Sequence, residues 1–116
     1  MITNERRAFK RVNKKFAITY KPHNSPGSVR GTSFTKNISA GGVYFTSIEG
    51  FDIGQMLECI IKMPKVAKES KWIGRVVRCE DIKGHVVKTY GIALEFAKSF
   101  GNADKDLRKA LEENGS

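Results

Sequence analysis

Apolar and polar residues alternate over several short runs, a pattern typical of half-buried β-strands. The first run places Phe16, Ile18 and Tyr20 on one face, and Pro22 ends it. A loop rich in turn-forming residues follows, and a run rich in Ser and Thr then extends over residues 29–38. The sequence therefore predicts two strands in the first third of the chain.

The same alternation continues through the middle of the chain. The further predicted strands cover residues 43–46, 56–63, 72–79 and 90–96. The fourth strand has one apolar face, formed by Leu57, Cys59, Ile61 and Met63. In the fifth strand we expect the apolar positions to be Ile73, Val77 and Cys79. The sixth strand has a face formed by Tyr90, Ile92, Leu94 and Phe96.

Only the end of the chain has helical spacing. Leu107, Ala110 and Leu111 lie at positions i, i+3 and i+4, and Asn102 is suited to cap the first turn. Six strands followed by one helix favour an all-β fold, a small six-stranded antiparallel barrel with a C-terminal α-helix. An OB-fold or an SH3-like barrel would give a similar pattern.

The chain of 116 residues is expected to form a single domain over residues 1–116. Within it we expect a flexible basic arm over residues 1–15, the barrel over residues 16–97 and the helix over residues 102–114. The formal net charge is +9, and the arm holds six basic residues against one acidic residue. Residues 62–78 have the same balance. This charge favours an anionic partner.

Several classes of protein are not expected. The chain has no apolar run long enough for a membrane helix and no apolar stretch typical of a signal peptide near its start, so we expect a cytoplasmic location and no membrane insertion. Cys59 and Cys79 are expected to be buried reduced thiols, and His23 and His85 to be solvated loop residues. No nucleophile, phosphate loop or metal-ligand spacing is evident. We expect a protein that is not an enzyme and that has no catalytic residues, metal or cofactor.

Two short segments carry candidate chemistry. Arg7 and Arg11 lie four residues apart, and a guanidinium fork matches both phosphate and the O6/N7 edge of guanine. Asn37, Ser39 and Gly42 combine polar side chains with a glycine, which permits a positive φ and close approach of a ligand. Taken singly, these segments are more often a solvated basic tail and a plain hairpin turn.

Together, in this order, the two segments resemble the two ligand motifs of the PilZ domain family, RxxxR and [D/N]xSxxG. Residues 72–78 look like a later strand of that family, and residues 91–96 look like its closing strand. The resemblance extends over residues 5–97.

The resemblance implies a six-stranded barrel that binds cyclic di-GMP, a bacterial second messenger with two guanines and two phosphodiesters. By family analogy, Arg7 and Arg11 bind phosphate and guanine, and Asn37, Ser39 and Gly42 line the barrel side of the site. The amide of Asn37 stands where many relatives carry a carboxylate.

Three further residues are candidates for ligand contact. Arg6 stands where, in this family, an Arg is associated with binding two stacked ligands per chain, and a third guanidinium helps to neutralise their four phosphodiester charges. Trp72 and Gly74 are candidates for additional contacts, although a place in the core is the favoured interpretation for Trp72.

We therefore expect a cyclic di-GMP receptor that orders its Arg arm over the barrel and signals through a partner protein. One alternative is a small nucleic-acid-binding barrel, which the net charge and the Lys-rich residues 62–71 would suit. Nucleic acid is not the expected partner, because the aromatic residues do not form an evident exposed face. Another alternative is a PilZ protein that acts only as a docking adaptor.

Overall fold

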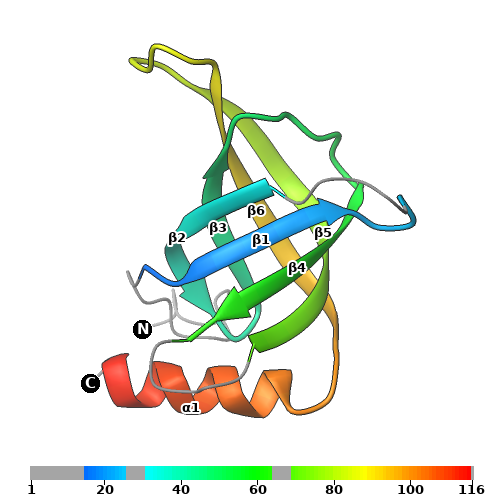
Figure 1. Cartoon of the computed structure of the whole chain (residues 1–116), viewed down its shortest axis with the longest axis vertical. Coiled ribbons are helices and arrows are strands. Elements are labelled where there is room, and N and C mark those ends of the chain that lie inside the picture. The colour runs from blue at the N-terminus through cyan, green and yellow to red at the C-terminus, as the bar shows by residue number, and fades with distance from the viewer. Residues whose placement is uncertain (1–14, 26–30, 64–68, 116) are drawn as a thin grey trace, which may run out of the picture.

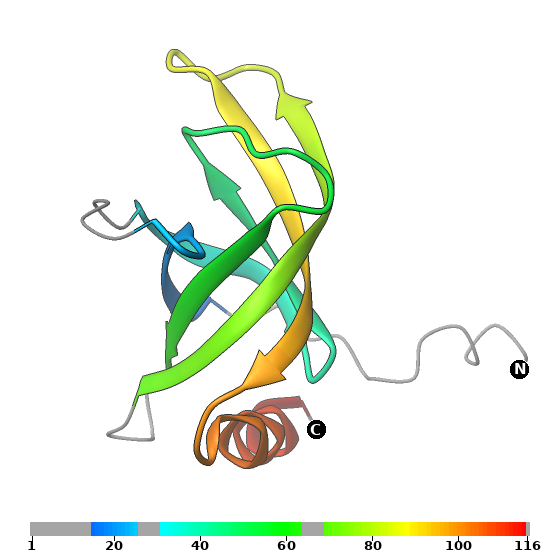
Figure 2. The same cartoon turned by 90° about the vertical axis from the view of Figure 1, so that its right-hand side faces the viewer.

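The computed structural model describes residues 15–25, 31–63 and 69–115. These residues form six strands and one helix (Figures 1 and 2). In chain order they are β1 (Ala17–Pro22), β2 (Gly31–Ser39), β3 (Gly42–Ser47), β4 (Met56–Lys62), β5 (Glu69–Ile82), β6 (Thr89–Ser99) and α1 (Ala103–Gly115). The predicted basic arm, up to residue 14, lies outside the described residues.

The strands form a closed antiparallel barrel in the order β1-β2-β3-β6-β5-β4. The first and fourth strands close the ring, with Ile18 opposite Ile61 and Tyr20 opposite Cys59. The predicted fold class, a six-stranded antiparallel barrel with a C-terminal helix, is confirmed.

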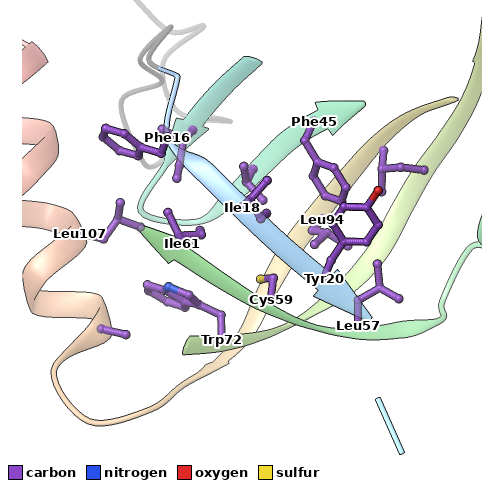
Figure 3. Close-up of a cluster of buried hydrophobic side chains, with 14 of the residues drawn as sticks. Phe16, Ile18, Tyr20, Phe45, Leu57, Cys59, Ile61, Trp72, Leu94 and Leu107 are labelled. Carbon is purple, nitrogen blue, oxygen red and sulfur yellow. The ribbon is translucent and has the colours of Figure 1, made fainter. Parts of the chain in front are cut away.

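Alternating side chains of the strands fill the interior of the barrel (Figure 3). On β1, Phe16, which directly precedes the strand, and Ile18 and Tyr20 are buried, as predicted. The predicted inner face of β4 is buried as well, from Leu57 to Met63, which directly follows the strand. Here the period of two in the sequence matches the pleat of the sheet.

The prediction for β5 was wrong in both its length and its inner face. The strand has 14 residues, and its buried side chains include Trp72 and Val76, whereas Val77 is exposed. The pairing of β5 with β6 shifts register between Ile73 and Gly74 and again between Val76 and Arg78. The buried positions nevertheless alternate regularly from Ser70 to Val76, so the predicted face was wrong because apolar residues stand on both faces of this strand.

The helix α1 lies across one end of the barrel (Figures 1 and 2). Its buried residues Leu107, Ala110 and Leu111 are those that the helical spacing predicts. The carbonyl of Asn102 accepts a hydrogen bond from the amide of Asp106, at 2.8 Å, so the first helical turn begins there. In the part of the chain that the structure describes, no helix has the length and apolar character needed to cross a membrane.

Two further expectations need correction. Cys79 is only partly buried, whereas Cys59 is fully buried. His23 is not simply solvated, because its Nδ1 lies 3.2 Å from Oε2 of Glu58 on β4. An ionised carboxylate can only accept a hydrogen bond, so Nδ1 of His23 is the donor. The strands that close the barrel therefore also share a polar contact on its surface.

Candidate functional site

The candidate site is a shallow hollow of about 170 Å³ on the outside of the barrel. Four neighbouring strands supply its lining, β2, β3, β6 and β5. The lining residues are Asn37, Ser39, Gly42, Val43, Tyr44, Arg78, Ala93 and Leu94.

Strand pairing arranges the residues around the hollow in two rows that cross the strands. The first row runs Asn37, Tyr44, Ala93 and Arg78, each paired with the next. The second row runs Ser39, Gly42, Glu95 and Arg75. It lies two residues along β2, β3 and β6, and three along β5, where the register shifts between Val76 and Arg78. Residues two apart on a strand project from the same face, so both rows lie on the outer surface.

Gly42 allows two strands to approach each other at the hollow. A Cβ at this position would collide with the carbonyl oxygen of Leu94 on β6. The expected positive φ is not found, because among the described glycines only Gly54, Gly84 and Gly101 have one. The requirement for glycine at position 42 is therefore steric rather than conformational.

The turn beside the hollow is held by Ser39. Its Oγ accepts a hydrogen bond from the amide of Gly41, at 3.1 Å. The carbonyl of Gly41 accepts in turn from the amide of Phe96 on β6, at 2.9 Å. These bonds fix the β2–β3 turn against the neighbouring strand, so Asn37 and Ser39 are presented by a rigid hairpin.

The opposite rim of the hollow carries a polar cluster. The hydroxyl of Tyr44 donates a hydrogen bond to Oε2 of Glu80, at 3.0 Å, and Nε of Arg78 lies 3.7 Å from Oε1 of the same carboxylate. Cζ of Arg78 lies 5.6 Å from the centre of the Tyr44 ring, within the range of a cation–π contact.

Burial raises the pKa of Tyr44 above its ordinary value, and the hydrogen bond and charge of Glu80 raise it further, while Arg78 acts in the opposite direction. The Tyr44 hydroxyl therefore remains a donor at neutral pH. With Arg78, the rim offers one fixed positive charge and one hydroxyl beside the polar groups of the turn.

The structure brings together three of the residues singled out from the sequence. Asn37, Ser39 and Gly42 all line the hollow. Arg6, Arg7 and Arg11 lie outside the described residues. The sequence analysis did not name the other lining residues as site residues, and two of them, Tyr44 and Arg78, have polar or charged side chains.

The two additional candidates lie elsewhere. Trp72 is 3% exposed and lies within the buried cluster (Figure 3). Its ring stacks on that of Phe96, with the centroids 4.1 Å apart. Gly74 is buried, and a Cβ there would contact the side chain of Leu94 at 3.2 Å. Neither residue lines the hollow.

The described residues bring no group of three or more His, Cys, Asp or Glu side chains close enough to hold a metal ion. The lining of the hollow, with its amide, hydroxyls and guanidinium, is suited instead to a ligand that combines negative charge with hydrogen-bonding edges.

Solved structures similar to this one share its fold. MotI/DgrA, the inhibitor of motility of Bacillus subtilis, matches with a TM-score of 0.74 and 19% identity over 93% of this chain, which spans 51% of that protein. The PilZ domain of YcgR from Escherichia coli, solved with c-di-GMP, matches with a TM-score of 0.65 and 12% identity over 96% of this chain and 98% of that one.

The PilZ domain of CeSA from a cellulose-synthesizing bacterium has a TM-score of 0.60 and 13% identity, over 90% of this chain and 98% of that one. At these identities the likeness concerns the fold. No curated protein matches the sequence. The model of the PilZ domain family matches residues 5–113, most of the chain, and the chain belongs to this family.

Proposed function

We propose that this protein is a cyclic di-GMP receptor rather than an enzyme, and that the hollow is the barrel side of its ligand site. The observation that carries the proposal is the convergence of Asn37, Ser39 and Gly42 with the guanidinium of Arg78. A guanidinium matches phosphate and the O6/N7 edge of guanine, and an amide can pair with guanine donors or acceptors.

The size of the hollow indicates that these residues form only part of a site. Its volume is about 170 Å³, whereas pockets for small molecules are typically about 300–1,000 Å³. A cyclic dinucleotide would need further contacts, and the RxxxR motif of Arg7 and Arg11 is our candidate for them.

The start of β1 supports this assignment. Phe16 donates its amide proton to Oγ1 of Thr35, at 2.9 Å, and its carbonyl accepts from the amide of Thr35, also at 2.9 Å. Thr35 lies on β2, two residues before Asn37. Arg11 precedes Phe16 by five residues, which span at most about 18 Å when fully extended. The length of chain between Arg11 and Phe16 is therefore compatible with a contact between the motif and the strand that carries Asn37.

In the proposed mechanism, ligand binding orders the segment of residues 1–15 over the outer face of the barrel, because the ligand neutralises like charges that otherwise repel. The change in surface shape and charge would then be recognised by a partner protein. We place this receptor in the bacterial cytoplasm.

Calorimetric titration with cyclic di-GMP, with GTP as a control ligand, tests the proposal. We expect saturable binding of cyclic di-GMP and no comparable binding of GTP. The double substitution Arg7→Ala and Arg11→Ala should weaken binding by about a hundredfold or more, because a hydrogen bond to a charged group contributes about 1.5–3 kcal/mol.

The double substitution Lys14→Ala and Lys15→Ala is the matched control, since it removes two positive charges from the same segment. If both double variants lose the same affinity for cyclic di-GMP, the arginines contribute only through their positive charge. Unchanged affinity in the arginine variant would refute the proposed site. A stoichiometry near two ligands per chain supports the role proposed for Arg6, and a stoichiometry near one removes it.

A further inference from the structure

One carboxylate outside the lining of the hollow contacts two residues of its rim. Glu80 on β5 accepts the Tyr44 hydrogen bond on one oxygen, and its other oxygen lies 3.7 Å from Nε of Arg78. An anionic ligand that approaches Arg78 therefore meets a guanidinium whose charge this carboxylate already offsets in part.

The backbone beside the cluster keeps Glu80 in this position. Tyr44 extends across β6 over Gly91, where a Cβ would collide with the Tyr44 hydroxyl oxygen. The absence of a side chain at Gly91 thus leaves room for the Tyr44 hydroxyl to reach Glu80. The hydrogen bond from Tyr44 gives the carboxylate of Glu80 a partner that does not depend on Arg78.

The contact between Glu80 and Arg78 is weak enough to be exchanged. Their side chains are 49% and 58% exposed, and exposed ion pairs of this kind contribute little free energy. A ligand phosphate or guanine edge offers Arg78 a bidentate partner in place of this single longer contact.

We propose that Glu80 is an internal competitor for Arg78, a positioning residue that sets the affinity of the hollow for anionic ligands and releases Arg78 when one binds. This inference rests on the proposed function, because it concerns the same site. Glu80 would oppose ligand binding, whereas the other residues proposed for the site favour it.

Substituting Glu80→Gln tests the inference, because glutamine can still accept the Tyr44 hydrogen bond but carries no charge. We expect cyclic di-GMP to bind about two- to fivefold more tightly, the range that corresponds to an exposed ion pair. Asp81→Asn is the matched control. Asp81 is the next residue on β5, its Oδ2 lies 3.3 Å from Nζ of Lys88, and it does not line the hollow.

A double-mutant cycle with Arg78→Ala separates competition from a general change in charge. The increase in affinity caused by Glu80→Gln should disappear when Arg78 is already replaced by alanine. Arg78→Ala alone should weaken the binding of cyclic di-GMP. The inference would be overturned if Glu80→Gln increased the affinity equally in the wild type and in Arg78→Ala. It would also be overturned if Asp81→Asn increased the affinity as much as Glu80→Gln does.

The proposed function and this inference can fail separately. Wild-type protein that binds cyclic di-GMP, with the same affinity in Glu80→Gln, overturns the inference alone. Wild-type protein that does not bind cyclic di-GMP overturns both. Thermal unfolding of each variant, at a midpoint close to that of the wild type, establishes that the compared proteins are folded.

Discussion

At the scale of single residues, Gly42 has a structural requirement beside its proposed role in binding. The outer surface is hollow at this point because β3 carries no side chain where it approaches the Leu94 carbonyl. The same feature that makes room for a ligand therefore brings two strands together, and a substitution here affects the barrel as well as the site.

We predict that Gly42→Ala lowers the free energy of unfolding by about 1–3 kcal/mol, the usual cost of overpacking a close contact. Chemical denaturation measures this change. Gly50→Ala is the control, because a Cβ there would meet the side chain of Tyr90 at 3.2 Å and no backbone atom among its nearest neighbours. Equal stability of Gly42→Ala and wild type would show that β3 and β6 can separate at no cost.

The sequence indicates one side of the candidate site but not the other. Asn37, Ser39 and Gly42 follow the pleat of two strands and a tight turn, so their spacing alone places them together. Arg78 reaches the hollow because the register shifts after Val76, which puts Arg78 rather than Val77 opposite Ala93. A bulge depends on how two strands pair, and one strand's sequence does not specify it.

At the scale of elements, strands β1 and β4 close the barrel, and His23, which directly follows β1, pairs with Glu58 on β4. Burial opposes ionisation of Glu58, but the hydrogen bond from His23 and the positive charges of Lys21 and Lys71 outweigh it and hold the pKa of this carboxyl below its ordinary value of 4.5. A carboxyl with a lowered pKa stabilises the folded state above its unfolded pKa, and this contribution is lost as the pH falls through the folded pKa.

We predict that Glu58→Gln costs about 0.5–1 kcal/mol of stability at neutral pH, and that the difference from wild type shrinks as the pH falls below 4.5. Urea denaturation at a series of pH values measures it. Glu112→Gln on α1 removes the same charge at an exposed position and serves as the control. A difference that does not change with pH would mean that the ionised form of Glu58 has no role.

The elements themselves were largely predictable. The inner faces of β1, β4 and β6 and the buried stripe of α1 follow from hydrophobic spacing, because regular pairing preserves the period. The fifth strand did not follow, because apolar residues stand on both of its faces and the buried face is that of Trp72 and Val76, not that of Val77. The prediction of residues 72–79 covered only the middle of a strand that spans Glu69–Ile82.

At the scale of the whole molecule, the net charge of +9 attracts anions of every kind, including nucleic acid. A small ligand and a polyanion differ in how steeply their binding depends on salt. Cyclic di-GMP carries two phosphodiester charges, whereas a nucleic-acid strand releases a counterion for each phosphate that the protein neutralises.

We predict that the affinity for cyclic di-GMP falls only gently with salt, with a slope of log K against log salt of magnitude about 2 or less. Titrations at several salt concentrations measure the slope, and a single-stranded RNA of mixed sequence is the comparison. RNA binding that exceeds cyclic di-GMP binding at physiological salt would favour the nucleic-acid alternative.

The closed ring of strands also limits how a partner can recognise this domain. Among the described residues, each of the six strands has a neighbour on both sides, so the barrel has no strand with a free edge along its whole length. The far end of β5, from Arg78 to Ile82, extends beyond its pairing with β4 and pairs with β6. Many signalling domains bind an extended peptide by accepting it as an additional strand along a full sheet edge, and the closed ring of described strands does not present such an edge around the barrel. A partner must instead distinguish the ligand-bound form by the side chains and loops on its surface, where ligand binding would alter charge and shape.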